Sequence, residues 1–323
     1  MLKKTLLALA LATSLGFATA TAQADTRVTL KAAKAGSSYY VMMVQLGEMM
    51  KKESGGKILP TVEESQGSVQ NVKEAARRPG NFLFTSPPSL LADARAGNKP
   101  FEGESGHDRA RALFVVPFVT VHLAVQQDSG ITDVMQLAGQ KFIAGGKGTF
   151  CEGRTLKIFE LLGLAGQVEV IDVELNAASS AMRNDKVAGF ATCSSHPTPQ
   201  LVELATTTPL TLISFTDEQR DRILSADPMS GPLTIAAGTY KDQASDVHTV
   251  GVPVGAFTTT DMDDDTAYFI TKSFWQQRED LAKANPWWAG VSPEMVNQLG
   301  TTLHPGALRY YREAGVELSP DLL

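Results

Sequence analysis

Residues 26–63 read TRVTLKAAKAGSSYYVMMVQLGEMMKKESGGKILPTVE, and this stretch decides the fold class. Val28 to Ala33 interleaves apolar residues with Thr and Lys, which predicts a short β-strand. Gly and Ser residues at 36–38 interrupt it, and a Ser cap then begins an amphipathic helix over Tyr39 to Lys52. Ile58 to Glu63 is predicted as the next strand. Strands and helices that alternate through short loops are typical of a sheet covered by helices.

The same alternation continues outward along the chain. The next elements predicted are a helix at 68–77, a strand at 82–85, a helix at 89–96 and a long buried strand at 113–125. A second unit follows, with strands at 142–144, 168–173 and 187–192 and helices at 154–162 and 177–184. After about residue 215 come a helix at 217–224, mixed strand and turn, a helix at 266–284 and a helix–turn–helix through Pro305-Gly306.

These elements predict an α/β fold with a mostly parallel sheet, divided into two lobes. We expect lobe 1 to comprise residues 25–126 and 216–323, and lobe 2 to comprise residues 127–215. The chain then crosses between the lobes twice, near residues 126 and 216. Two crossings side by side make a hinge, and the cleft between such lobes is where a ligand binds.

The N-terminus carries the features of a secretory signal peptide. Lys3 and Lys4 precede an apolar run from Leu6 to Phe17, and Ala22-Gln23-Ala24 supplies a small-x-small cleavage site. We therefore expect residues 1–24 to be removed after Ala24, leaving a soluble periplasmic protein. The run is shorter than a membrane-spanning helix needs, which disfavours the alternative of a retained anchor.

Composition excludes several classes of protein. The chain has 323 residues, 43% of them hydrophobic, and a formal net charge of -6 from 35 acidic and 29 basic residues. A disordered chain and a multi-span membrane protein do not have this composition. Nucleic-acid binding requires a basic surface that this balance does not supply, so we expect no nucleic-acid partner. A monomer is the plain expectation.

Cys151 and Cys193 are the two cysteines of the chain. In an oxidising compartment an even pair favours a disulfide, which would close a loop of about 42 residues. Two free buried thiols are the alternative. A third interpretation is a periplasmic enzyme in which one cysteine is the nucleophile and His196 its base.

Three loops rich in Gly, Ser and Thr lie where predicted strands end and helices begin: residues 36–40, 65–68 and 145–149. Helix N-termini expose unpaired N–H groups, so three of them directed into one cleft would make an anion site. The alternative is that each loop is only a capped turn. The GGKGT stretch at 145–149 lacks the Walker A spacing. No histidine pair has metal-ligand spacing, and no catalytic triad stands out, so we expect no metal, no cofactor and no catalytic residues.

Several stretches resemble the solute-binding subunits of TAXI-type TRAP transporters. They are GSSYY (36–40), QGSVQNV (66–72), DSGITDVMQLAGQKF (128–142), HPTPQLVELATTT (196–208), AAGTY (236–240), TVGVPVGAF (249–257) and LHPGALRYYRE (303–313). They span nearly the whole chain after the signal peptide in the family's order. The resemblance implies a type II periplasmic-binding-protein fold that closes on a small organic anion. The family's ligands are glutamate-like amino acids and 2-oxo or hydroxy dicarboxylates.

The resemblance also implies partners, namely the small and large membrane permease subunits of a TRAP transporter, separate or fused. A different role stays open, in which the closed protein docks on a sensor receptor instead of a permease. In both cases the partner protein would recognise the closed arrangement of the two lobes.

Carried over by position, the resemblance implies a set of ligand-binding residues in each lobe. In lobe 1 they are Ser37, Ser38, Tyr39, Tyr40, Gly67, Ser68, Asn71 and Ser86. In lobe 2 they are Gly148, Thr149, Phe150 and Cys151. Phe150 replaces a Gly of the family and Cys151 a hydroxyl residue, which makes this wall smaller and less polar. A Cys151–Cys193 disulfide would brace it. Lys147 and Arg154 flank the loop and either pair with a second ligand carboxylate or point to solvent.

Overall fold

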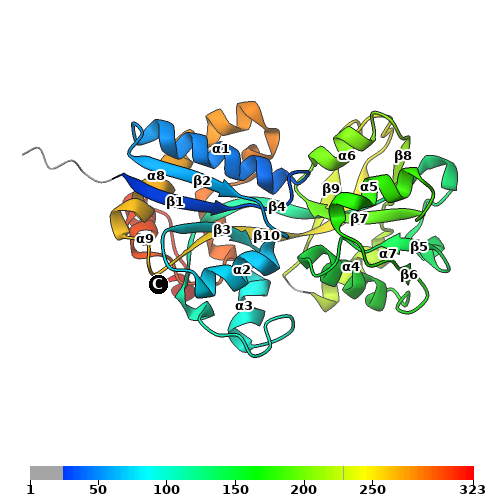
Figure 1. The fold of residues 1–323 in the computed structure, drawn as a ribbon, viewed down its shortest axis with the longest axis horizontal. Helices are drawn as coiled ribbons and strands as arrows, with labels where there is room; N and C mark the ends of the chain where they lie inside the picture. Colours follow the sequence, from blue (N-terminus) through cyan, green and yellow to red (C-terminus); the bar gives the residue numbers. More distant parts are fainter. Residues whose placement is uncertain (1–24, 228) are drawn as a thin grey trace, which may run out of the picture.

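The structure is a computed structural model that describes residues 25–227 and 229–323; the predicted signal peptide lies outside the described residues. Two α/β lobes lie side by side along the longest axis (Figure 1). The strands are β1 (Thr26–Lys31), β2 (Ile58–Glu63), β3 (Phe82–Ser86), β4 (Ala110–Gln126), β5 (Lys141–Ile143), β6 (Glu169–Val170), β7 (Gly189–Ser194), β8 (Leu210–Leu212), β9 (Gly231–Ile235) and β10 (Val247–Thr259).

The α-helices cover both lobes. They are α1 (Ser38–Glu53), α2 (Ser68–Arg77), α3 (Pro88–Ala96), α4 (Phe150–Leu161), α5 (Leu175–Arg183), α6 (Pro199–Leu204), α7 (Asp217–Ala226), α8 (Asp264–Ala284) and α9 (Pro305–Glu313). In Figure 1, α1–α3, α8 and α9 surround the strands of one lobe, and α4–α7 those of the other. None of the helices in the described part of the chain is long and apolar enough to cross a membrane.

The strands form one sheet in the order β2-β1-β3-β10-β4-β7-β5-β6, with β8 added on β4 and β9 on β10. The α/β class is therefore confirmed. The expectation of a mostly parallel sheet is wrong in the middle, because β4 and β10 run antiparallel to each other and to β3 and β7. The predicted bounds of β2 and α2 agree with the structure, whereas α6 and β10 were not predicted. Gly251, Pro253 and Gly255 within β10 favoured turn over strand at the sequence level.

The two lobes are joined where β4 and β10 pass from one to the other. Thr120 of β4 pairs with Gly251 on one side and with Ser194 of β7 on the other. Gly251 has no room for a side chain, since a Cβ there would clash with the Val119 carbonyl oxygen. This close approach lets two long strands cross between the lobes side by side.

The hydrophobic core changes lobe at this same crossing. Val119 and Val252 belong to the core of the first lobe, whereas Val121 and Val250 belong to a core of the second. Ile223 of α7 also packs in the second lobe. We therefore propose that lobe 2 spans residues 120–251, so that the chain returns near Gly251 in place of the predicted return near residue 216.

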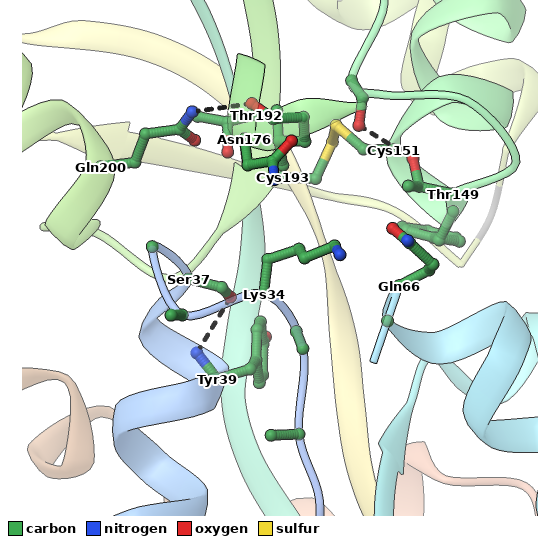
Figure 2. A pocket seen from close by; sticks show the side chains of 18 of the residues that line it. Lys34, Ser37, Tyr39, Gln66, Thr149, Cys151, Asn176, Thr192, Cys193 and Gln200 are labelled. Carbon is green, nitrogen blue, oxygen red and sulfur yellow. Dashed lines mark hydrogen bonds between the residues drawn. A yellow bond between two sulfur atoms is a disulfide. The ribbon is translucent and has the colours of Figure 1, made fainter. Parts of the chain in front are cut away.

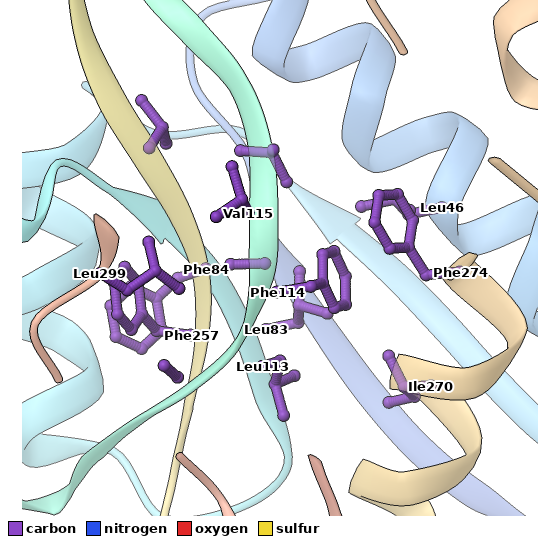
Figure 3. Packing of buried hydrophobic residues seen from close by; sticks show 14 of the residues in the cluster. Leu46, Leu83, Phe84, Leu113, Phe114, Val115, Phe257, Ile270, Phe274 and Leu299 are labelled. Atoms are coloured by element: carbon purple, nitrogen blue, oxygen red, sulfur yellow. The ribbon is translucent and has the colours of Figure 1, made fainter. Parts of the chain in front are cut away.

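The first lobe is built around aromatic side chains on both faces of the sheet (Figure 3). Phe114 of β4 stacks on Phe274 of α8, with ring centroids 4.0 Å apart and planes 15° apart. Phe84 and Phe257 pack together on neighbouring strands, with centroids 5.9 Å apart. These contacts hold α8 against the sheet and make the first lobe a rigid base for the site.

A cluster of paired charges joins β1, β2 and α2 at the edge of the first lobe. The buried Lys31 ammonium lies 3.0 Å from a Glu63 oxygen and 2.7 Å from a Glu74 oxygen. Arg78 pairs with the same two carboxylates, at 2.8 Å and 3.2 Å. The hydrogen bond from Arg78, assisted by Lys31, lowers the pKa of Glu63 to about 2.

We expect the charge of Glu63 to stabilise the fold at neutral pH and to lose this effect in acid. Because its pKa is lower in the folded chain, the contribution is complete above about pH 4.5 and is lost as the pH falls toward about 2. Glu63→Gln should therefore lower the Tm at neutral pH and flatten the decline of Tm over this acid range. Circular dichroism melts at a series of pH values measure this. The exposed Glu279→Gln control should keep the wild-type profile, and a Glu63→Gln profile parallel to the wild type would contradict the prediction.

Candidate functional site

A cavity of about 420 Å³ lies between the two lobes and is lined by residues of both. Its first-lobe wall comes from the loops after β1 and β2, and its second-lobe wall from the loop before α4, the end of β7 and the helices α5 and α6. Figure 2 shows the two walls facing each other across the cleft. All three Gly/Ser/Thr loops singled out in the sequence contribute to this one cavity.

The loop before α1 contacts the second lobe directly. Ser37 caps the helix by accepting a hydrogen bond from the Tyr39 N–H at 3.1 Å. The Ser38 hydroxyl lies 2.5 Å from that of Ser194 and donates to the Ser195 carbonyl oxygen at 3.0 Å. These contacts connect the first turn of α1 to the end of β7, so one side of the cavity is closed by hydrogen bonds between the lobes.

Tyr39 forms a neutral wall of the cavity. Its hydroxyl donates to the Pro117 carbonyl oxygen at 2.7 Å, and burial raises the pKa of the phenol, so it stays protonated. The ring therefore offers an apolar surface to a ligand, while its polar end is already hydrogen-bonded.

The N-terminus of α2 lies at the cavity, and within the described residues no side chain caps it. Gly67 is the N-cap residue, at φ 103°, and it supplies no side chain to accept from the first N–H groups of the helix. Ser68 and Asn71 of this helix also line the cavity. The Asn71 amide donates to the Ala32 carbonyl oxygen at 2.8 Å, which ties α2 to the loop after β1. This helix end is suited to bind the negative charge of a ligand.

The N-terminus of α4 is arranged differently, because side chains at the start of the same helix cap it. The Thr149 hydroxyl accepts from the Glu152 N–H at 3.0 Å, and the Glu152 carboxylate accepts from the Gly148 N–H at 2.7 Å. Gly145 has φ 117°, and a Cβ there would lie 2.6 Å from the Cys151 sulfur. The loop is thus packed tightly against the cysteine that follows it.

Cys151 and Cys193 form a disulfide, with Cα atoms 5.3 Å apart, and both residues line the cavity. The bond joins the first turn of α4 to the end of β7 in the second-lobe wall (Figure 2). Thiolate catalysis requires a reduced cysteine, and neither sulfur is free. His196, the candidate base, has its Nδ1 atom 2.9 Å from the Thr120 hydroxyl. The interpretation as a cysteine-dependent enzyme therefore lacks its nucleophile.

The predicted contact residues divide into two groups. Those that line the cavity are Ser37, Tyr39, Gly67, Ser68, Asn71, Thr149, Phe150 and Cys151. Those that lie outside its lining are Ser38, Tyr40, Ser86, Lys147, Gly148 and Arg154.

The two predicted cations have protein partners. The Lys147 ammonium lies 3.1 Å from an Asp172 oxygen on the surface. Arg154 is buried, pairs with Asp227 and donates to the Ser230 hydroxyl. Both side chains are therefore engaged away from the cavity. Within the described residues, no group of three or more His, Cys, Asp or Glu side chains is placed to hold a metal ion.

Several cavity residues were not predicted from the sequence. The polar and charged ones are Lys34, Glu64, Gln66, Thr85, Asn176, Ser179, Ser180, Arg183, Thr192, Gln200 and Glu203. Gln66 lies within the loop at 65–68, and Lys34 stands two residues before the loop at 36–40, so their positions were a usable signal. Asn176 lies on α5 and Gln200 on α6. The sequence of these two segments gave no indication that they face the first lobe.

Two α/β lobes joined by two crossing strands, with a cavity between them, define the fold of the two-lobed periplasmic binding proteins. The model of the NMT1-like family matches residues 30–315, and the chain belongs to this family.

Solved structures with this fold are similar to the chain over nearly its whole length. A periplasmic transporter matches with TM-score 0.50 and 13% identity, covering 90% of this chain and 93% of its own. The periplasmic binding protein BugD matches with TM-score 0.52 and 13% identity, covering 91% and 99%. A protein from Bordetella bronchiseptica matches with TM-score 0.51 and 15% identity, covering 93% and 85%. At these identities the likeness shows the fold.

Proposed function

We propose that this protein is a periplasmic solute-binding protein that captures a small organic anion and delivers it to a membrane permease. The observation that carries the proposal is the cavity between the lobes, with the uncapped N-terminus of α2 in its wall. A ligand held there contacts both lobes at once, so binding favours the closed arrangement that a permease recognises. This function is binding without a chemical step.

The size and lining of the cavity support a small polar ligand. A volume of about 420 Å³ lies within the range of small-molecule sites. Hydroxyl and amide groups from both lobes surround it, among them Ser68, Thr149, Asn176 and Gln200. We propose a glutamate-like amino acid or a 2-oxo or hydroxy dicarboxylate as the ligand class, since such acids combine one or more carboxylates with groups that hydrogen-bond to amides and hydroxyls.

The finer assignment is to the TAXI type of TRAP transporter. It is supported by the resemblance of the stretches at 36–40, 66–72 and 303–313, together with the two-lobed fold. Export through the N-terminal signal peptide is part of the same proposal, because a permease of this kind takes its ligand from the periplasm.

Calorimetry with the mature protein tests the function. The protein is unfolded in denaturant, freed of bound ligand, refolded and titrated with glutamate, 2-oxoglutarate and malate. We expect at least one acid to bind with a Kd in the micromolar range or below. Native mass spectrometry of the protein as purified should show an adduct that disappears after this treatment. Absence of binding at millimolar concentrations of every acid would contradict the anion assignment.

A further inference from the structure

Two lysines at the end of β1 have opposite surroundings. Lys31 is buried, and the carboxylates of Glu63 and Glu74 neutralise it. Lys34 lies three residues later, in the loop that follows the strand, and lines the cavity. Within the part of the chain that the structure describes, Lys34 forms no ion pair with a carboxylate. Its charge is thus left for a group that enters the cavity.

The Lys34 side chain reaches into the space between the lobes. Figure 2 shows the side chain extended between the two walls, with its amine on the side of the cleft where Gln66 and Thr149 lie. Hydrogen bonds fix the backbone below it: the Ser65 hydroxyl and the Asn71 amide both donate to the Ala32 carbonyl oxygen, each at 2.8 Å. The base of the lysine is therefore held beside the first turn of α2.

The other charged residues of the lining lie at its rim. Glu64, Arg183 and Glu203 are exposed, whereas Lys34 is half-buried. The Glu64 carboxylate also accepts a hydrogen bond from the Ala35 N–H at 3.4 Å. Charges at a solvated rim are screened by water and salt, and a charge deeper in a cleft is screened less. Among the charged side chains of the lining, Lys34 is consequently the least exposed to solvent, and its charge is screened the least.

We propose that the Lys34 ammonium, together with the unpaired N–H groups at the start of α2, binds a carboxylate of the ligand and makes the site selective for anions. This inference rests on the proposed function and names the residue that determines its charge preference. The opposite wall presents the neutral amides of Asn176 and Gln200 and the Thr192 hydroxyl. A ligand therefore lies with an anionic end toward the first lobe and its hydrogen-bonding remainder toward the second.

The test compares Lys34→Met, Lys34→Arg and the control Lys57→Met in the ligand-free mature protein. Lys57 is an exposed lysine of the same lobe that precedes β2 and does not line the cavity. Each protein is titrated with glutamate, 2-oxoglutarate and malate, and with the amide counterpart of each acid in which one carboxylate is neutral. Circular dichroism melts verify that the variants are folded.

We expect Lys34→Met to bind the preferred acid about 10- to 100-fold more weakly, as for loss of a charge-assisted hydrogen bond. Its preference for the acid over the amide should shrink by a similar factor, which a purely structural role for Lys34 would not cause. Lys34→Arg should recover part of the affinity for the acid and part of the preference for the acid over the amide. Lys57→Met should match the wild type in both measurements.

The outcomes separate the two proposals. If the wild type binds an acid and Lys34→Met binds it equally well with the same acid-to-amide preference, the inference about Lys34 is overturned and the proposed function stands. If the wild type binds none of the acids, the proposed function and the inference about Lys34 are both overturned.

Discussion

Replacing Cys151 and Cys193 together by serine is expected to destabilise the second lobe by about 3–4 kcal/mol. The disulfide closes a loop with a sequence separation of 42, and in the chain-entropy model its loss restores that much freedom to the unfolded chain. For a unit of this size the Tm should fall by about 10 °C. Thermal unfolding of the oxidised wild type and of the double variant measures the difference.

The same substitution should weaken ligand binding, because both cysteines line the cavity. Wild-type protein treated with a reducing agent is the matched control and should reproduce the Tm of the double variant. Intact mass before and after reduction should differ by two hydrogens. A Tm that is unchanged in both the reduced protein and the variant would contradict a stabilising disulfide.

Phe114→Ala is expected to lower the free energy of unfolding of the first lobe by about 3–5 kcal/mol. Phe114 is fully buried and stacks on Phe274, so the substitution leaves a cavity between β4 and α8. Urea unfolding followed by tryptophan fluorescence measures the change, since Trp275 and Trp288 both contact the ring of Phe274.

This variant also separates stability from binding. Phe114 does not line the cavity, so folded Phe114→Ala protein should keep the ligand affinity of the wild type. Phe114→Leu fills more of the space and should lose less stability. A Phe114→Ala loss below about 1 kcal/mol would mean that the surrounding side chains collapse into the space.

The sequence predicted the local elements of the first lobe well. The bounds of β2 and α2 agree with the prediction, because alternation and helical spacing depend on residues close together in the chain. The sequence predicted an element less well where its formation depends on partners that are distant in the chain. The strand β10 holds two glycines and a proline, and it is stabilised by pairing with β3, β4 and β9. Its strand character follows from those neighbours and not from its own composition.

The candidate site shows the same division. The Gly and Ser loops at the ends of strands were recognisable, because such loops meet at one edge of an α/β sheet. Lys147 and Arg154 had the right charge and a plausible position, yet each is paired with an aspartate outside the cavity. Lys34 was not singled out, although it stands two residues before one of these loops, because only the fold shows that Lys31 is paired with two glutamates and that Lys34 lines the cavity.

The sequence by itself therefore determined the alternating elements, the glycine loops and the presence of two cysteines. The tertiary structure alone decided that the cysteines are bonded, that Thr120 of β4 pairs with Gly251 of β10, and that Lys34 lines the cavity. The physical reason is that the period of a pattern specifies which face of an element is buried. Which partner covers that face, and which side chains remain free to meet a ligand, depend on long-range packing.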